Sequence, residues 1–258
     1  MKFFQKKFRT GVVLSGGAVR GIAHLGILQA LIDKNIQIDI ISGASAGALA
    51  GAFFSEGFPP AEILEIFSKK KLFDLVRISI PRSGLFRVEG LKKLLKKYLK
   101  TSNLEDLPIP LVVATTNFRE GRAEYFESGP LIDVLMASSN LPILFEMAKI
   151  NGVPYTDGGV TDNLPVEPIR DRCRNIIACH VNPLGEYEAH KNPIQVIERT
   201  FHLAIASEIH RKKELVDLFI EPAELSSFGL LDFRKSKTIF DIGYKTAQKA
   251  LDNSKFDK

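Results

Sequence analysis

The chain has 258 residues, of which 45% are hydrophobic and 25% charged, a balance typical of a globular protein with a substantial core. The net charge of +5 suits an anionic partner surface without requiring one. No stretch reaches the roughly 20 consecutive apolar residues of a membrane-spanning helix, and the N-terminus lacks the apolar segment of a signal peptide. We therefore expect a cytoplasmic protein, with Cys173 and Cys179 as buried, reduced thiols.

The first predicted unit is a short strand at 11–14, a glycine-rich turn at 15–21 and a helix at 22–32. Such a turn places several backbone N–H groups at the start of a helix, where they can bind an anion. That anion can be a phosphate or the oxyanion of an acyl-transfer intermediate, and the residues leave both open.

Three residues of this unit need separate interpretation. The stretch 16–21 matches a dinucleotide-binding loop only with Ala18 in place of the middle glycine. Arg20 is either a surface charge or a donor to carbonyl groups of the loop. His24 lies inside the predicted helix, and we expect it to be a packed, hydrogen-bonded structural residue.

The second unit is the G-x-S-x-G pentapeptide at 43–47, which follows an apolar run at 36–41 and precedes a small-residue helix. Strand, pentapeptide and helix together are the context of a nucleophile elbow, a sharp turn that exposes the serine hydroxyl. Gly43 and Gly47 allow the strand and helix backbones to approach each other. The helix after Ser45 directs unpaired N–H groups toward the same point, which favours a developing anion. The pentapeptide alone is equally compatible with a structural turn.

Two helices are predicted at 61–71 and 88–100, with a loop or short strand at 72–85 between them. In the second helix the leucines share one face and the lysines share the other. This pattern is typical of a helix packed on the core with a solvated lysine face. The alternative is a basic face on anionic lipid, at the inner face of a membrane. Aromatic residues do not alternate with these lysines, so we expect no nucleic-acid partner.

The remaining elements complete an α/β pattern. Further strands are predicted at 109–116, 123–126, 176–181 and 219–221, and further helices at 131–138, 193–218 and 238–251. Alternating strands and helices predict a mostly parallel central sheet covered on both faces. No repeat or low-complexity linker divides the chain, so we expect a single domain over 5–250 and a frayed tail at 251–258.

A last motif follows residue 156. Asp157 precedes two glycines, Gly158 and Gly159, in a tight turn that can hold its carboxylate toward a cleft. Asp-Gly turns are common, so this motif alone is also compatible with a structural role. Asp162 and Asn163 are expected to shape the same loop and not to act chemically. No loop gathers carboxylates as a calcium site does, and we expect no metal or other cofactor.

Three separated motifs now stand in one chain: the loop at 16–21, the pentapeptide at 43–47 and the turn at 157–159. In this order and context they resemble the patatin-like phospholipase family, and the resemblance spans roughly residues 10 to 185. It includes Ala23-His24-Leu25-Gly26, the stretch from Ala137-Ser138-Ser139 to Pro142, and Asn163-Leu164-Pro165. The family usually has glycine where this chain has Ala18. Alanine is small, so we expect the loop amides to remain usable.

The resemblance implies a three-layer α/β/α protein with a patatin/lysophospholipase-like fold that hydrolyses a lipid or lysolipid ester. Transferred position by position, Ser45 is the nucleophile and Asp157 is its proton acceptor. The amides of Gly16, Gly17 and Ala18 form the oxyanion hole. The motifs give supporting roles to Arg20, Gly21, Gly43, Gly47, Gly158 and Gly159. Ester hydrolysis needs these three parts, an activated hydroxyl, a base and oxyanion donors, and it proceeds through an acyl-enzyme.

Three alternatives stay open at this point. A Ser-His-Asp esterase of the α/β-hydrolase type needs a histidine late in the chain, and the chain offers His180, His190, His202 and His210. A catalytically idle lipid-binding or regulatory module would keep the fold, although the intact serine and aspartate argue against it. A nucleotide-binding regulator would use the glycine-rich loop for phosphate.

Overall fold

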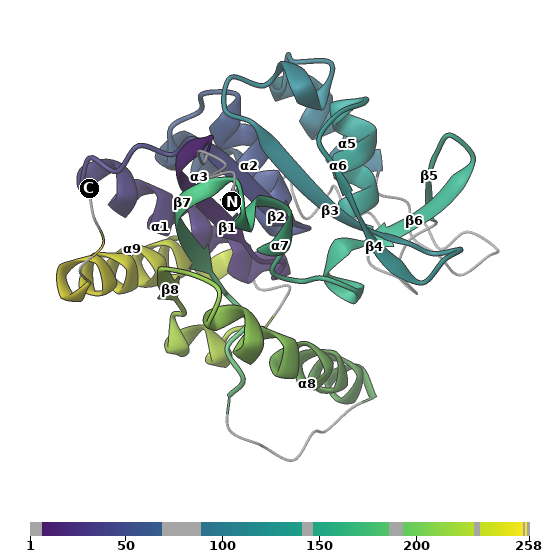
Figure 1. Ribbon diagram of the computed structural model, residues 1–258. Helices are drawn as coiled ribbons and strands as arrows, with labels where there is room; N and C mark the ends of the chain where they lie inside the picture. Colours follow the sequence, from purple (N-terminus) through teal and green to yellow (C-terminus); the bar gives the residue numbers. More distant parts are fainter. Residues whose placement is uncertain are drawn as a thin grey trace, which may run out of the picture.

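The computed structural model describes residues 7–68, 89–140, 147–185, 193–229, 233–254 and 256. The loop predicted at 72–85 and Pro142 of the motif lie outside these residues. Within them, strands and helices build one eight-stranded mixed sheet between two helical layers (Figure 1).

The sheet is parallel through its centre and antiparallel at one edge. Its strands are β1 (Phe8–Leu14), β2 (Ile40–Ala44), β3 (Leu111–Asn117), β4 (Arg122–Phe126), β5 (Ala148–Ile150), β6 (Val153–Asp157), β7 (Cys173–Cys179) and β8 (Leu218–Ile220). The strand order is β5-β6-β3-β2-β1-β7-β8, and β4 also pairs with β3. The neighbouring pairs β3-β2, β2-β1, β1-β7 and β7-β8 are parallel. The pairs β3-β4, β3-β6 and β5-β6 are antiparallel. The predicted, mostly parallel central sheet is confirmed.

Helices cover both faces of this sheet, which confirms the three-layer α/β/α architecture. One layer contains α1 (Ile22–Asp33), α2 (Ala46–Ser55), α3 (Pro60–Ser68), α5 (Glu89–Tyr98), α6 (Leu131–Ser138) and α9 (Ser236–Asn253). The other contains α7 (Glu167–Arg170) and α8 (Pro193–Lys213). Along β1 the side chains alternate between layers: Val12 and Leu14 pack in the first, and Val13 packs in the second.

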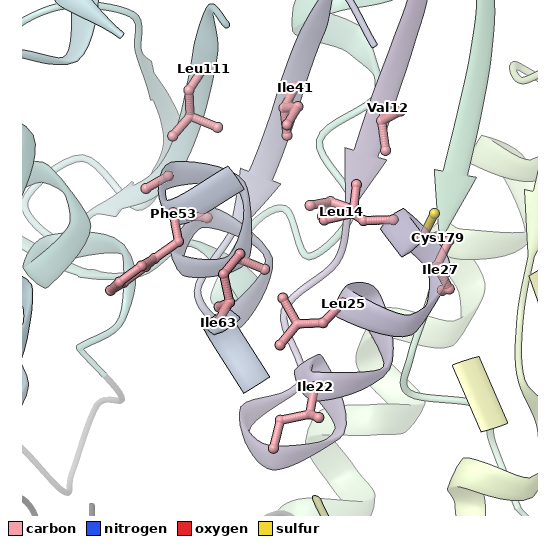
Figure 2. Close-up of a cluster of buried hydrophobic side chains, with 14 of the residues drawn as sticks. Val12, Leu14, Ile22, Leu25, Ile27, Ile41, Phe53, Ile63, Leu111 and Cys179 are labelled. Carbon is pink, nitrogen blue, oxygen red and sulfur yellow. The ribbon is translucent and has the colours of Figure 1, made fainter. Parts of the chain in front are cut away.

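The larger core lies between the sheet and the first layer (Figure 2). Leu14 and Ile41 point from the strands toward Phe53 of α2 and Ile63 of α3, and all four side chains are fully buried. Each such burial stabilises the fold by about 1.5–3 kcal/mol. Because both faces of the sheet are covered, the central strands are nearly continuous apolar runs.

Several elements differ from the sequence prediction. The strand predicted at 36–41 begins at Ile40 and continues to Ala44. The hairpin of β5 and β6 was not predicted, because its short strands contain polar residues and Pro154, which weaken the strand signal. Helix α9 continues to Asn253, three residues into the predicted frayed tail, because Leu251 packs against the core.

Helix α5 has the predicted amphipathic character. Leu95 and Leu99 are buried, whereas Lys93, Lys96 and Lys97 are exposed. Contact of this lysine face with an anionic membrane stays a prediction. In the part of the chain that the structure describes, no helix has both the length and the apolar character needed to cross a bilayer.

Helices α1 and α9 pack backbone to backbone through two glycines. A Cβ on Gly26 would lie 2.0 Å from the carbonyl oxygen of Phe240, and a Cβ on Gly243 would lie 2.2 Å from that of Ala23. Side chains cannot approach a backbone this closely, so any larger residue must push the helices apart.

We predict that Gly243→Ala lowers the free energy of unfolding by about 1–2 kcal/mol, because an overpacking cost of up to about 3 kcal/mol outweighs the roughly 1 kcal/mol that alanine gains in helix propensity. Urea unfolding followed by circular dichroism measures the change. Gly229→Ala is the matched control, because its Cβ would meet no described atom within 4 Å. Equal stability of the two variants would contradict this account of the helix pair.

Candidate active site

Ser45 occupies the sharp turn between β2 and α2, with φ 49° and ψ −119°. A positive φ is strained for a residue with a side chain, and such strain is characteristic of functional turns. The flanking glycines permit the turn. A Cβ on Gly43 would lie 2.7 Å from the nitrogen of Ala48, and a Cβ on Gly47 would lie 2.2 Å from the carbonyl oxygen of Leu14.

Ser138 holds this turn from the neighbouring helix α6. The backbone N–H of Ser45 donates to the Ser138 Oγ at 2.9 Å, and the Ser138 hydroxyl donates to the carbonyl oxygen of Ala114 in β3 at 2.7 Å. Ser138 is fully buried. Sequence analysis placed this residue in a family stretch but gave it no role, because only the fold brings it beside the elbow.

The Ser45 hydroxyl donates a 2.6 Å hydrogen bond to Oδ2 of Asp157. Asp157 is the last residue of β6, where it lies opposite Thr115 of β3. Its other carboxylate oxygen, Oδ1, accepts the backbone N–H of Gly159 at 2.8 Å. The turn after β6 therefore fixes one oxygen and leaves the other facing the serine.

Burial gives this carboxylate the properties of a base. Asp157 is 2% exposed, and this burial raises its pKa from 3.8 to about 6, against the opposing effect of the hydrogen bonds from Ser45 and Gly159. A group with this pKa is still ionised at neutral pH, yet it accepts a proton far more readily than an ordinary aspartate.

The glycine-rich loop passes directly beside the elbow. A Cβ on Gly16 would lie 3.5 Å from the Cβ of Ser45. In the described residues, the N–H groups of Gly17 and Ala18 have no hydrogen-bond partner, so both are available to an incoming oxyanion. Ala18 has φ 47°, in the left-handed region that glycine enters without strain, which accounts for the glycine usual in the family.

One predicted oxyanion donor needs correction. The N–H of Gly16 donates to the carbonyl oxygen of Asn163 at 3.0 Å, so it is occupied and cannot also bind an oxyanion. The Gly16 carbonyl accepts the side-chain amide of Asn182 at 2.8 Å and the hydroxyl of Ser15 at 2.9 Å. Gly16 therefore anchors the loop, and the two residues after it present their amides.

Arg20 and His24 hold the same region from inside. Arg20 is 4% exposed, so it is not a surface charge. Its Nε donates to the carbonyl oxygen of Phe228 at 2.8 Å, which ties the loop to a segment distant in the chain. The fully buried His24 has its Nε2 2.8 Å from the carbonyl oxygen of Ser15. Burial lowers the pKa of His24 to about 4, so the neutral ring donates this bond, in line with the predicted structural role.

The loop after Asp157 is fixed by side chains of its own and of α8. Asp162 accepts hydrogen bonds from the Tyr125 hydroxyl at 2.7 Å and from the buried Lys212 Nζ at 2.5 Å. The Oδ1 of Asn163 would lie 2.5 Å from a Cβ on Gly16 and 2.7 Å from one on Gly159. Asn163 thus fills the space between the glycine-rich loop and the aspartate turn, which requires glycine on both sides.

Two further glycines of the motifs are also closely packed. A Cβ on Gly158 would lie 2.2 Å from the carbonyl oxygen of Ala114, and a Cβ on Gly21 would lie 2.4 Å from the Cβ of Ala46. The first contact brings the aspartate turn against β3, the neighbour of β2, and the second brings the glycine-rich loop against α2, which begins at the elbow. The supporting glycines therefore set the spacing of the site.

The histidine alternative finds no support in the described residues. His180 pairs through Nδ1 with Oε1 of Glu221 at 2.8 Å, and His210 lies on the exposed side of α8. His190 and the side chain of His202 lie outside the described residues. Among those that are described, no cluster of three or more metal-ligating side chains forms, and Cys173 and Cys179 are buried and form no disulfide.

We predict that Ser138→Ala lowers kcat by about 10- to 100-fold, because it removes the acceptor for the N–H of the strained elbow and a donor to the Ala114 carbonyl. Steady-state ester hydrolysis measures the loss. Ser139→Ala is the matched control, since the Ser139 hydroxyl has no hydrogen-bond partner in the described part of the chain. The role assigned to Ser138 is wrong if both variants retain wild-type kcat.

We also predict that Asp157→Asn stabilises the protein at pH 8. Because the folded-state pKa of about 6 exceeds the unfolded value of 3.8, stability is lost as the pH rises through this window. Above pH 6 the buried charge lowers the free energy of unfolding by about 2–3 kcal/mol, and the uncharged asparagine avoids this loss. Thermal and urea unfolding at pH 4 and pH 8 measure the difference. A variant less stable than wild type at pH 8 would contradict this cost of burial.

Comparisons with known proteins identify the family. A family model for the patatin-like phospholipase family matches residues 12–170. The chain is 26% identical to the lysophospholipase NTE1 of Coccidioides immitis over 95% of its own length, but it spans only 18% of that protein. It is 30% identical to an uncharacterized NTE family protein of Mycobacterium tuberculosis over 62% of this chain and 45% of the relative.

Two solved structures share the fold. VipD from Legionella pneumophila aligns with a TM-score of 0.55 at 18% identity, over 95% of this chain and 67% of VipD. ExoU from Pseudomonas aeruginosa, in complex with SpcU, aligns with a TM-score of 0.52 at 15% identity, over 96% of this chain and 52% of that one. With the family model matching more than half of its length, the chain belongs to the patatin-like phospholipase family.

Proposed function

We propose that the protein hydrolyses carboxylic esters of lipids, with Ser45 as nucleophile and Asp157 as its base. The observation that carries this proposal is the 2.6 Å contact between the Ser45 hydroxyl and a buried carboxylate, beside two backbone amides that are free to donate. Family membership and relatives named lysophospholipases support the lipid ester as substrate class.

The proposed reaction begins when Ser45 attacks the ester carbonyl carbon and Asp157 takes the hydroxyl proton. The tetrahedral intermediate places its oxyanion against the amides of Gly17 and Ala18, and each such donor contributes on the order of 100- to 1000-fold in rate. Asp157 then gives the proton to the departing alcohol, which leaves an acyl-enzyme. A water molecule, deprotonated by the same carboxylate, hydrolyses the acyl-enzyme and regenerates the serine.

The strained elbow and the helix that follows it have complementary effects. The conformation of Ser45 fixes its hydroxyl toward Asp157 before substrate arrives, so little orientation is lost in reaching the transition state. Helix α2 begins immediately after the serine, and its first N–H groups add a partial positive charge on the side where negative charge develops.

We predict that Ser45→Ala and Asp157→Asn each lower kcat/KM for a lysophospholipid by about 1000-fold or more.

In the wild-type enzyme we expect kcat/KM to fall tenfold per pH unit below about pH 6, because protonated Asp157 cannot act as a base. A fluorophosphonate probe labels Ser45 covalently, and peptide mapping locates the label.

The matched controls are Ser139→Ala and Asp133→Asn. Asp133 is exposed on α6, so its substitution removes the same charge away from the elbow. Both should retain wild-type kcat/KM. Near-wild-type hydrolysis by Asp157→Asn would show that another group is the base.

A further inference from the structure

A pocket of about 480 Å³ lies where the carboxyl ends of β7 and β8 meet α8. His180 and Asn182 line it from the segment after β7, Glu221 lines it after β8, and Ile205 and Ile209 line it from α8. The pocket adjoins the glycine-rich loop, because Asn182 lines it and donates through its side chain to the Gly16 carbonyl. No step of the proposed reaction uses it.

Two residues that line this pocket each carry a buried polar atom with no partner in the part of the chain that is described. His180 is 3% exposed and its Nδ1 faces the Glu221 carboxylate at 2.8 Å, yet its Nε2 is buried without a hydrogen bond. Asn182 is 7% exposed, and its Oδ1 is likewise buried and unpaired. Such groups are destabilising unless a ligand or ordered water satisfies them.

The donor and acceptor pattern of these atoms indicates a hydroxyl group. The Glu221 carboxylate fixes a proton on Nδ1 of His180, so Nε2 carries a lone pair in the neutral ring and a proton in the charged one. The Asn182 oxygen only accepts. With the charged ring, one hydroxyl can accept from Nε2 and donate to Asn182. With the neutral ring both atoms accept, so two hydroxyls are needed, one donating to each, and a polyol supplies both arrangements.

The pocket also contains an unneutralised cation. Lys213 is exposed, lies with Nζ 5.2 Å from the centre of the Phe219 ring, and has no acidic partner in the described ranges. Its neighbour Lys212 is turned the other way and is paired with Asp162 and Glu167. Phe219 and Lys213 both line the pocket, so a phosphate there would meet a positive charge.

We propose that this pocket binds a phosphate ester of a polyol, and that this group is the headgroup of the lysophospholipid substrate. The assignment rests on the proposed function, and it names glycerol- or inositol-type headgroups as preferred over choline, which offers no hydroxyl. The phosphate lies against Lys213, the headgroup hydroxyls lie against His180 and Asn182, and the ester lies at the adjoining elbow.

The test compares kcat/KM for lysophosphatidylglycerol and lysophosphatidylcholine with the same acyl chain. We expect wild type to prefer the glycerol headgroup. Lys213→Met should lower kcat/KM about tenfold for both lipids, the effect of one lost charge-assisted hydrogen bond, because both carry the phosphate. His180→Phe should lower the ratio of the two kcat/KM values through loss of the hydroxyl partner. The matched control is Lys149→Met, an exposed lysine on β5 at the opposite edge of the sheet, which should leave both kcat/KM values unchanged.

The outcomes separate this proposal from the one on which it rests. Labelling of Ser45 by the fluorophosphonate and hydrolysis of both lipids show that the proposed function holds. The headgroup assignment alone is then overturned if wild type has no preference, if His180→Phe leaves the ratio unchanged, or if Lys213→Met leaves both kcat/KM values unchanged. Absence of labelling and of hydrolysis overturns the proposed function and this assignment with it. Because Lys213 is exposed, its variant should fold even if His180→Phe does not.

A second measurement distinguishes a lipid headgroup from a free ligand of the same chemistry. Thermal unfolding is followed with increasing glycerol 3-phosphate in wild type and in Lys213→Met. A rise in Tm in wild type alone, together with unchanged kcat/KM values for both lipids in Lys213→Met, assigns the pocket to a free polyol phosphate and overturns the headgroup assignment. Lower kcat/KM values for both lipids in Lys213→Met support the headgroup whatever the free ligand does.

Discussion

The hydrogen bond between the Ser45 hydroxyl and the buried Asp157 carboxylate joins two segments that are 112 residues apart in the chain. Burial of this carboxylate has two effects. Removal from water opposes its ionisation, which destabilises the folded protein at neutral pH, and it raises the affinity of the carboxylate for a proton, as a base requires. Much of the surrounding structure keeps this one contact short and dry, including the antiparallel edge that places β6 beside β3.

The site is assembled from loops that hold one another. Asn163 separates the glycine-rich loop from the aspartate turn and accepts the N–H of Gly16 through its carbonyl. Asn182 binds the carbonyl of the same glycine from the other side, and Ser138 holds the elbow. Because each loop depends on side chains from another strand or helix, the geometry is a property of the whole sheet and not of any motif by itself.

The features that could be predicted from the sequence are those determined by residues that are neighbours in the chain. Motifs whose residues are adjacent in the chain identified Ser45 and Asp157 as candidates, and periodic apolar runs predicted the central strands. The occupied amide of Gly16 could not be predicted, because its partner Asn163 lies 147 positions away. Ser138, Arg20 and the glycines between α1 and α9 likewise act through contacts that only the fold creates.

The central claim is that burial makes Asp157 a base that shares a proton with Ser45. Titration of the aspartate side-chain carboxyls by ¹³C NMR, with Asp157→Asn to assign the resonance, tests it most directly. The account predicts a pKa of about 6 in the wild-type protein, and a higher pKa in Ser45→Ala, because the hydroxyl that stabilises the carboxylate is gone. A pKa near 3.8 that does not change in Ser45→Ala would contradict it.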